Sequence, residues 1–197
     1  MINGSKWWLW EGDVPKKTCE KIIKLGKSKK SIKGVLDKGT YDPIKRKSSL
    51  VWLNDQKIFD LMSYYINLAN KNAGWNVEIS RTEDVQFTNY DKKGHYDWHV
   101  DCADEPYGED SHENFKGKIR KLSCIINLSD GDKFEGGDLF IAQDQSGSPE
   151  KKIKRITELR KQGSVVVFPS YTHHKISPIK KGKRHSLVTW SIGQPWK

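Results

Sequence analysis

The hydrophobic pattern of the chain changes near Gly74, from helical spacing before it to short β-type runs after it. Apolar residues between Ile58 and Ala69 recur at intervals of three and four positions, which predicts an amphipathic helix. Asn54 or Asp55 is suited to cap its start, and Gly74 is suited to the left-handed conformation at its end. We expect this helix to lie against a sheet as a buttress.

The first fifty residues predict fewer elements. The tryptophan-rich segment 7–10 predicts an early or edge strand whose rings pack on the body of the domain. Pro15 is placed to begin a helix over 16–25, with Gly26 as its stop. The polar segment 27–46 reads as a loop with one short strand, or alternatively as a cover over a binding site.

Most of the chain after Gly74 consists of short runs rich in β-branched and aromatic residues, separated by Gly, Pro, Asp and Lys. The runs are Trp75–Ser80, Val85–Tyr90, Tyr96–Val100, Leu122–Leu128, Asp138–Ala142, Ser164–Phe168, Lys175–Ser177 and Ser186–Ile192. Such a series predicts a sandwich or a jelly-roll barrel. The charged segment Glu150–Lys161 is an exception and predicts a short helix or an extended excursion. Gly136-Gly137 predicts a tight turn with positive φ angles.

Length and composition place the chain among ordinary globular domains. Its 197 residues suit one domain, which we divide into a helical and edge-strand part (1–74) and a β core (75–193). Three scattered cysteines, no signal-peptide pattern and no long apolar run predict a reduced, cytoplasmic setting. The net charge of +10 raises nucleic acid as a partner, but the basic residues are dispersed and match no nucleic-acid-binding motif. We favour a solvated surface or an acidic protein partner.

The segment His95–Asp101 carries the candidate chemistry. On a strand, His99 and Asp101 would emerge on one face, while Trp98 and Val100 would face the other way. An imidazole and a carboxylate two residues apart can grip one cation, and a second histidine would complete the two-His-one-carboxylate triad of ferrous iron sites.

Two candidates for the third ligand follow the predicted strand within Gly163–Ser170. His173 and His174 are adjacent, and spacing alone does not choose between them. Arg184 comes ten residues after His174, and Ser186 follows it on the next predicted strand. A guanidinium fork and a nearby hydroxyl are suited to binding a carboxylate.

Three segments in this order resemble the iron(II)- and 2-oxoglutarate-dependent dioxygenases, and within them the prolyl 4-hydroxylase and PKHD-type hydroxylase group. They are Tyr90–Asp101, Phe134–Leu139, and Phe168–Ser170 continuing through His174–Ile179 to Arg184. The resemblance covers roughly Trp52 to Trp190. It implies a mainly β fold with flanking helices (α+β), in which a double-stranded β-helix (a jelly-roll, cupin-like core) is buttressed by N-terminal helices.

The resemblance also implies roles for individual residues. It assigns iron to His99, Asp101 and His174, and selects His174 over His173. It assigns 2-oxoglutarate to Arg184 and Tyr90, with Ser186 and Trp190 as further contacts in some branches, and substrate contact to Arg120. Asn127 stands where some relatives place a tyrosine near the cosubstrate, so it either substitutes or only packs. His95, His112, His185 and Cys102 are interpreted as structural.

The function implied is hydroxylation of a substrate carbon with Fe(II), 2-oxoglutarate and O2, releasing succinate and CO2, with ascorbate as a candidate reductant. The expected substrate is a prolyl or similar residue of a peptide or protein. Three alternatives remain open: a hydroxylase of a free amino acid or other small molecule, a non-catalytic jelly-roll binding module, and a protein directed at nucleic acid. A deep closed pocket would favour the small molecule. An open groove edged by Lys27–Arg46 and Asp104–Lys118 would favour a polypeptide.

Overall fold

The computed structural model describes residues 4–36, 39–103, 105–143 and 152–196. Its larger sheet has eight strands: β1 (Trp8–Trp10), β12 (Val165–Pro169), β8 (Ile119–Asn127), β15 (Arg184–Gly193), β6 (Val85–Tyr90), β4 (Ser49–Leu53) and β2 (Ile32–Lys33) in spatial order, with β5 (Arg81–Thr82) paired to β15. Its smaller sheet has five: β11 (Ile153–Arg155), β10 (Leu139–Ala142), β13 (His174–Ile176), β7 (His95–His99) and β3 (Arg46–Lys47). The strands β9 (Phe134–Gly136) and β14 (Ile179–Gly182) form a separate pair.

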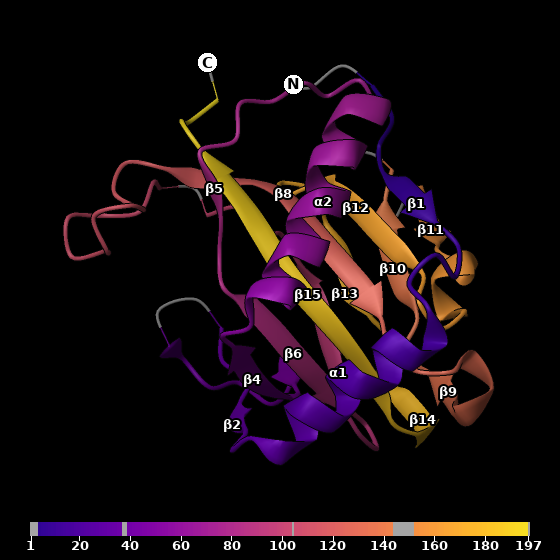
Figure 1. Ribbon diagram of the computed structural model, residues 1–197. Coiled ribbons are helices and arrows are strands. Elements are labelled where there is room, and N and C mark those ends of the chain that lie inside the picture. The colour runs from indigo at the N-terminus through magenta and orange to yellow at the C-terminus, as the bar shows by residue number, and fades with distance from the viewer. Residues whose placement is uncertain (1–3, 37–38, 104, 144–151, 197) are drawn as a thin grey trace.

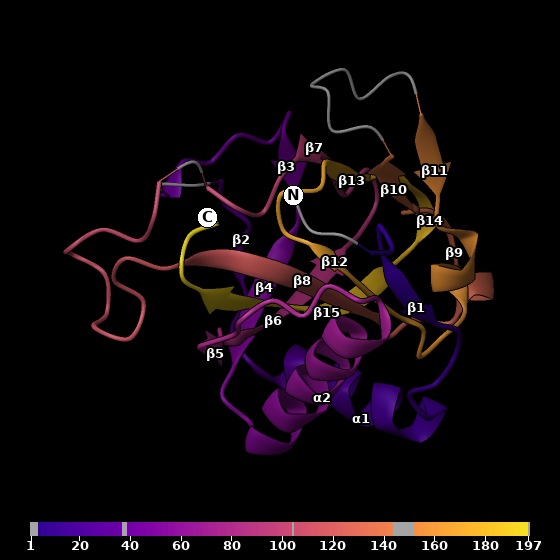
Figure 2. The ribbon, with the colours of Figure 1, turned by 90° about the horizontal axis from the view of Figure 1, so that it is seen from above.

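The two sheets face each other, and the helices α1 (Lys16–Ser28) and α2 (Gln56–Asn72) cover the outer face of the larger sheet (Figures 1 and 2). Successive side chains of β8 point to opposite faces of the larger sheet, so they belong to two different core clusters. Leu122 and Ile126 belong to the cluster beneath the helices, whereas Ile125 belongs to the cluster between the sheets. Every strand pairing is antiparallel. The predicted mainly β architecture with flanking helices is confirmed; the interpretation of residues 1–197 as one domain stays a prediction.

Helix α2 follows the sequence prediction. The Asp55 carboxylate accepts hydrogen bonds from the backbone N–H groups of Lys57 (3.0 Å) and Ile58 (3.2 Å), which caps the helix. Gly74 adopts φ = 74° just past its end. Within the described residues, no helix is long and apolar enough to cross a membrane.

Helix α1 does not stop at Gly26, and that prediction was wrong. The helix runs on to Ser28, and Gly26 is buried inside it. A Cβ atom at Gly26 would lie 2.6 Å from the ring of Phe87 on β6. The glycine therefore serves the close approach of α1 to the sheet and does not end the helix.

The predicted strand over Trp75–Ser80 was also wrong. The segment contains no strand, and Asn76 within it has a positive φ of 49°. The side-chain amide of Asn70 donates to the Val77 carbonyl (2.9 Å) and accepts from the Val77 N–H (2.9 Å). The Asn70 side chain thus makes the two backbone hydrogen bonds of Val77 that a neighbouring strand would otherwise make. Sheet pairing resumes only at β5.

Two segments that the sequence left open are partly described. Within Glu150–Lys161, residues 152–161 form β11 and a 3-10 helix, η3 (Thr157–Arg160), whereas 150 and 151 lie outside the described residues. Within Lys27–Arg46, β2 adds an edge strand to β4 and Arg46 begins β3, whereas 37 and 38 lie outside the described residues. The Gly136-Gly137 turn has positive φ angles (75° and 64°), as predicted.

Candidate metal centre and adjoining pocket

Three potential metal ligands converge where β7 and β13 pair. His99 ends β7 and lies directly opposite His174, which begins β13. Asp101 follows two residues after His99, and its carboxylate oxygens lie 3.6 Å from His99 Nε2 and 3.5 Å from His174 Nε2. One ligand atom from each of the three residues falls within 4.8 Å of the others. This donor set suits a cation held on one side only, as in two-His-one-carboxylate iron sites.

Both imidazoles are oriented for metal binding by their second ring nitrogens. Nδ1 of His99 faces the Asp97 carbonyl (2.8 Å), and Nδ1 of His174 faces the Thr172 carbonyl (3.0 Å). A carbonyl oxygen accepts only, so Nδ1 carries the hydrogen in each ring and Nε2 keeps its lone pair. The two lone pairs are therefore directed at Asp101, where a metal would lie.

Strand β7 ends at His99, so strand alternation does not determine the position of the Asp101 side chain. Asp101 is held instead by the turn that follows β12. The Ser170 carbonyl accepts hydrogen bonds from the N–H groups of Asp101 (2.8 Å) and Cys102 (2.9 Å). The Ser123 hydroxyl donates to Asp101 Oδ2 (2.7 Å). Val100, expected to face the other way, lines the same cavity as His99.

The electrostatics of Asp101 and His174 favour the protonation states that bind metal. Burial alone would raise the pKa of Asp101, but His174 and His99 outweigh it and hold the pKa well below its usual range. Burial, assisted by His99, lowers the pKa of His174 to about 4. At neutral pH the site therefore presents a carboxylate and an uncharged His174.

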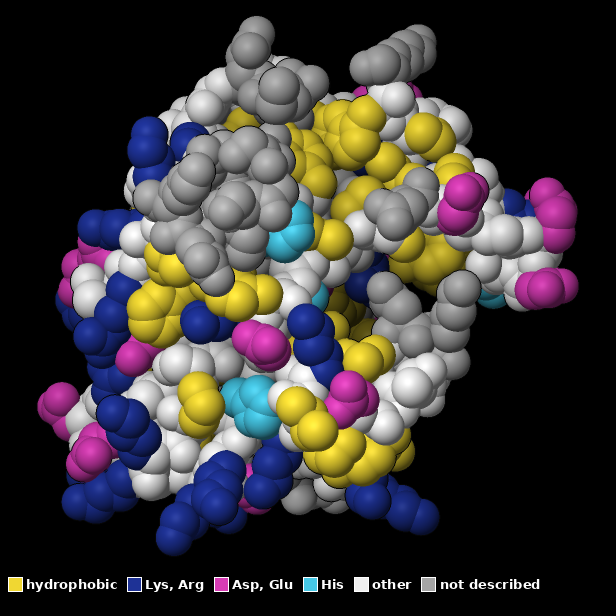
Figure 3. All heavy atoms as spheres, turned by 180° about the vertical axis from the view of Figure 1, so that it is seen from behind, with side chains coloured by type: hydrophobic (Ala, Val, Ile, Leu, Met, Phe, Trp, Pro, Cys, Tyr) yellow, Lys and Arg dark blue, Asp and Glu magenta, His cyan; other side chains and the backbone are white. Residues whose placement is uncertain are grey.

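A cavity of about 220 Å³ opens beside this cluster, on the side of the larger sheet away from the helices. Tyr90, Ile125, Val188 and Trp190 line it from the larger sheet, and segment 32–36 contributes Ile32, Val35 and Leu36. Figure 3 shows this face, which is hollowed and has hydrophobic side chains around the hollow. The cavity thus joins a metal-binding cluster to an apolar wall.

Arg184 is a buried cation whose donors are unused. It begins β15 opposite Tyr90, and only 2% of its surface is exposed. Nη1 and Nη2 of Arg184 and the hydroxyl of Ser186 have no hydrogen-bond partner among the described residues. The guanidinium lies 5.7 Å from the ring centroid of Tyr90, which lines the cavity although Arg184 does not. Burial lowers the pKa of Arg184, as expected for a charge without a partner.

A sequence profile of the 2OG-Fe(II) oxygenase superfamily matches residues 85–192, more than half of the chain. The chain belongs to the 2OG-Fe(II) oxygenase superfamily. A PKHD-type hydroxylase of Xylella fastidiosa (strain M23) is 31% identical over 113 residues, which are 56% of this chain and 44% of the relative. A PKHD-type hydroxylase of Synechococcus sp. (strain CC9605) is 36% identical over 95 residues, 48% of this chain and 35% of the relative. The matches thus span less than half the length of these relatives.

Solved structures show the same fold at low sequence identity. A Pseudomonas putida prolyl-4-hydroxylase superposes with a TM-score of 0.72 over 94% of this chain and 92% of its own, at 16% identity. A viral collagen prolyl hydroxylase from Paramecium Bursaria Chlorella virus-1 superposes with a TM-score of 0.67 over 98% and 99%, at 18% identity. The predicted resemblance and the jelly-roll, double-stranded β-helix fold are confirmed.

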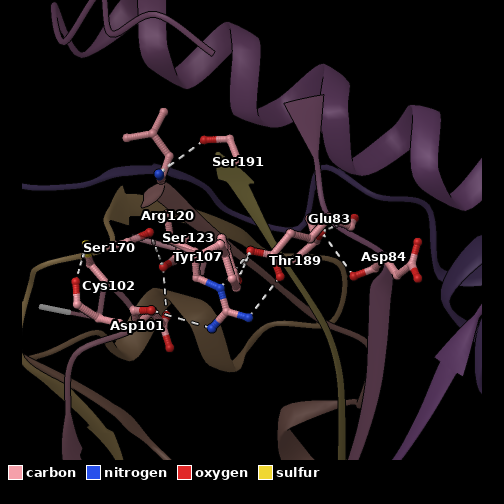
Figure 4. Close-up of polar contacts among 12 residues, drawn as sticks. Glu83, Asp84, Asp101, Cys102, Tyr107, Arg120, Ser123, Ser170, Thr189 and Ser191 are labelled. Carbon is pink, nitrogen blue, oxygen red and sulfur yellow. Dashed lines mark hydrogen bonds and ion pairs between the residues drawn. The ribbon is translucent and has the colours of Figure 1, made fainter. Parts of the chain in front are cut away.

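In this 2OG-Fe(II) oxygenase, Arg120 is bound to a residue that the sequence analysis missed. Its guanidinium makes a two-pronged ion pair with Glu83 (2.8 Å and 2.8 Å), and Tyr107 donates its hydroxyl to the same carboxylate (2.9 Å). Figure 4 shows Arg120 together with Glu83 and Tyr107. The guanidinium carbon of Arg120 also lies 3.8 Å from the centroid of the Trp190 ring. Burial alone would lower the pKa of Arg120, but Glu83 outweighs it and raises the pKa further. An acidic residue in a turn before a strand gives no sequence signal of this contact.

We expect Glu83→Gln to destabilise the protein by about 3 kcal/mol, because it leaves the largely buried charge of Arg120 without its carboxylate. Glu113→Gln is the matched control. Its side chain is 83% exposed and pairs with Lys116 at the surface, so its removal should change the free energy of unfolding by less than about 0.5 kcal/mol. Urea unfolding of both variants measures the difference. Equal free energies of unfolding for the two variants would show that the Glu83 pair is not a structural clamp.

Asn127 and two of the remaining histidines serve the fold. The Asn127 amide donates to the backbone carbonyls of Ser129 (2.8 Å) and Arg160 (2.9 Å), so of the two readings of Asn127 the structure favours packing. The ring of His95 contacts the carbonyls of Lys93 and Ile44. His112 is exposed on the loop after Tyr107.

His185 gives the protein a measurable pH dependence. It is 6% exposed, and burial together with Lys27 and Lys183 lowers its pKa to about 4. An unfolded histidine titrates near pH 6.5, so between pH 6.5 and 4 the unfolded chain binds a proton that the folded protein refuses. The resulting stability is complete above this window and is lost as pH falls through it.

We therefore expect the loss of stability between pH 7 and pH 5 to be smaller in His185→Gln than in the unmodified protein. A pKa difference of this size corresponds to about 2 kcal/mol at pH 5. Urea unfolding at the two pH values measures both losses. Identical losses in the two proteins would show that His185 is not the group responsible.

Proposed function

We propose that this protein is an Fe(II)- and 2-oxoglutarate-dependent dioxygenase that hydroxylates a carbon of its substrate. The observation that carries the proposal is the pairing of the His99, Asp101 and His174 cluster with the buried, unpaired guanidinium of Arg184. The first supplies a three-ligand iron site with open positions, and the second supplies a partner for a carboxylate. A jelly-roll module that only binds a partner would need neither a three-ligand metal cluster nor a buried, unpaired guanidinium.

The residues present fit the two absent groups. His99, Asp101 and His174 would hold iron, and the arrangement of their ligand atoms leaves the cavity side free. When bound, iron with 2-oxoglutarate and O2 supplies the oxidation that hydroxylates an unactivated carbon, with succinate and CO2 as coproducts. The uncharged His174 and the ionised Asp101 are in place for this at neutral pH.

The remaining assigned residues would position the cosubstrate and shield it from water. Arg184 would bind the distal carboxylate, and the Ser186 hydroxyl, also buried and unpaired, would add a donor. Tyr90 lines the cavity, has its ring 5.7 Å from the Arg184 guanidinium, and would contribute its phenol. Trp190 would form the wall behind the cosubstrate. Arg120, bound to Glu83, would contact substrate only through donors that the ion pair leaves free.

We propose a prolyl or similar residue of a peptide or protein as the substrate. The metal cavity adjoins a second cavity of about 600 Å³, since Val100, Asp101 and Arg120 line both. Segment 32–36 edges the first cavity, and residues 105–108 and 118–119 edge the second. These are the two loops expected to border a polypeptide groove, although residue 104 lies outside the described residues. A structural neighbour from Trichoplax adhaerens (TM-score 0.69, 15% identity) was solved with a hypoxia inducible factor peptide fragment.

Anaerobic titration of iron(II) and then 2-oxoglutarate tests the proposed site. We expect one equivalent of each to bind, with 2-oxoglutarate binding tighter when iron is present. A panel of proline-containing peptides, with free proline as the small-molecule control and ascorbate as reductant, then tests the substrate class by a mass increase of one oxygen atom. Modification of free proline alone would favour the small-molecule alternative, and salt-sensitive modification of RNA or DNA bases would favour the nucleic-acid alternative. A cytoplasmic location is part of the same proposal.

A further inference from the structure

A third cavity, of about 310 Å³, lies on the opposite, helix-bearing face of the larger sheet. It is bordered by the C-terminal end of α1 and by β4, β6 and the start of β15, where α1 crosses these strands (Figure 1). Lys27, Lys29 and Lys183 line it, together with Ser49, Asn89 and His185. None of these residues belongs to the metal centre or to its cavity.

The charge of this cavity is positive and uncompensated. No acidic side chain of the described residues lines it, and its three lysines form no ion pair with any described carboxylate. The low pKa of His185, caused by burial and then by Lys27 and Lys183, reports the same positive field inside the cavity. An anion would relieve this repulsion.

His185 contributes an imidazole to the lining of the cavity. The Ser129 hydroxyl oxygen accepts from the backbone N–H of His185 (2.8 Å), and the hydroxyl lies 3.2 Å from Nδ1 of the same residue. When the Ser129 hydroxyl donates to Nδ1, the imidazole hydrogen lies on Nε2 and can be donated to a ligand. His185 is 6% exposed as a residue, and its ring stacks on that of Phe87 with the ring centroids 5.6 Å apart.

A second neutral donor comes from β4. The Asn89 amide on β6 donates to the Ser49 hydroxyl oxygen (3.3 Å), which leaves the Ser49 proton for another acceptor. The cavity is therefore lined by three exposed lysines, the His185 imidazole and the Ser49 hydroxyl. A tetrahedral phosphate, with two charges and at least three acceptor oxygens, uses donors from several directions, whereas a carboxylate has only two oxygens.

We propose that this cavity binds the phosphate group of a small molecule, either inorganic phosphate or a phosphate monoester. Its volume lies at the lower end of the range of small-ligand pockets, about 300 to 1,000 Å³. It stands back to back with the proposed cosubstrate site, because Arg184 and Tyr90 face one side of the sheet while their neighbours His185 and Asn89 face the other. The inference does not depend on the proposed function.

The test is an NMR titration of the zinc-substituted, 2-oxoglutarate-loaded protein with inorganic phosphate and with glycerol phosphate, at ionic strength held constant with sodium chloride. We expect saturable shifts of the His185 ring and Asn89 amide signals. The double variant Lys27→Gln/Lys183→Gln should bind at least about tenfold more weakly, since each lost charge-assisted hydrogen bond is worth about a factor of ten. The matched control is Lys24→Gln/Lys180→Gln, which removes two exposed lysines outside the cavity and should bind as the unmodified protein does.

Each other outcome overturns the proposal. Absence of saturable shifts would show that the cavity holds no phosphate. Equal weakening in the control would mean general attraction to a basic surface, and competition with 2-oxoglutarate would place the anion at Arg184. Tighter binding of succinate than of phosphate, or binding of RNA without binding of phosphate, would assign the cavity to another ligand class.

Discussion

Replacing His174 by alanine is expected to weaken iron(II) binding by at least about 100-fold and to abolish turnover. Loss of groups that only orient a metal ligand typically costs 10- to 100-fold in affinity, so loss of a ligand itself should cost no less. His173→Ala is the matched control, because His173 is the adjacent histidine and lies outside the cluster of potential ligands. Its affinity should stay within about twofold of the unmodified protein.

Equilibrium dialysis against iron(II) under anaerobic conditions measures both affinities, and circular dichroism checks that each variant is folded. Equal iron retention in His174→Ala and in the unmodified protein would remove His174 from the proposed site. Loss of iron binding in His173→Ala but not in His174→Ala would identify His173 as the third iron ligand in place of His174.

Replacing Arg184 by methionine is expected to raise the dissociation constant for 2-oxoglutarate by about 100-fold while leaving iron binding intact. Removing one partner of a buried, hydrogen-bonded charge pair costs 2 to 5 kcal/mol or more in affinity. Methionine keeps most of the side-chain volume, so the cavity should not collapse. Calorimetric titration of 2-oxoglutarate into the iron-loaded protein measures the change.

Although Arg184→Met should bind 2-oxoglutarate more weakly, we expect it to be no less stable than the unmodified protein when no ligand is bound. Arg184 is a buried charge whose Nη1 and Nη2 have no partner among the described residues, and such a charge is costly in the ligand-free protein. The free energy of unfolding without ligand should therefore be equal or higher in Arg184→Met. A strongly destabilised variant would mean that Arg184 holds the fold together, and unchanged 2-oxoglutarate affinity would mean that the cosubstrate binds elsewhere.

The sequence predicted correctly those elements whose stabilising contacts lie within one short segment of the chain. The capping carboxylate of Asp55 and the apolar stripe of α2 lie within one segment, so the sequence displays them together. Gly26 and Trp75–Ser80 were misread because their partners are distant or unusual. Gly26 is determined by the ring of Phe87, and Val77 pairs with a side chain in place of a strand. No periodicity reports either contact.

The candidate site was predictable to the extent that it follows strand order. His99, Asp101 and His174 were expected to meet, and the pairing of β7 with β13 brings them together. The position of Asp101 could not be derived from strand alternation, since the Ser170 carbonyl holds it beyond the end of β7. Glu83 was missed altogether, because its role depends on the pairing of β8 and β5 with β15 and on the loop that carries Tyr107.

The proposed function requires the cluster of His99, Asp101 and His174 and the buried guanidinium of Arg184 to act on one bound 2-oxoglutarate. The most direct test is to load the protein anaerobically with iron(II) and 2-oxoglutarate, add oxygen and measure succinate. We predict oxygen-dependent succinate release by the unmodified protein and by His173→Ala, and none by His174→Ala or Arg184→Met at the same cosubstrate concentration. Absence of succinate from the unmodified protein under all conditions, or undiminished release by both variants, would contradict the account.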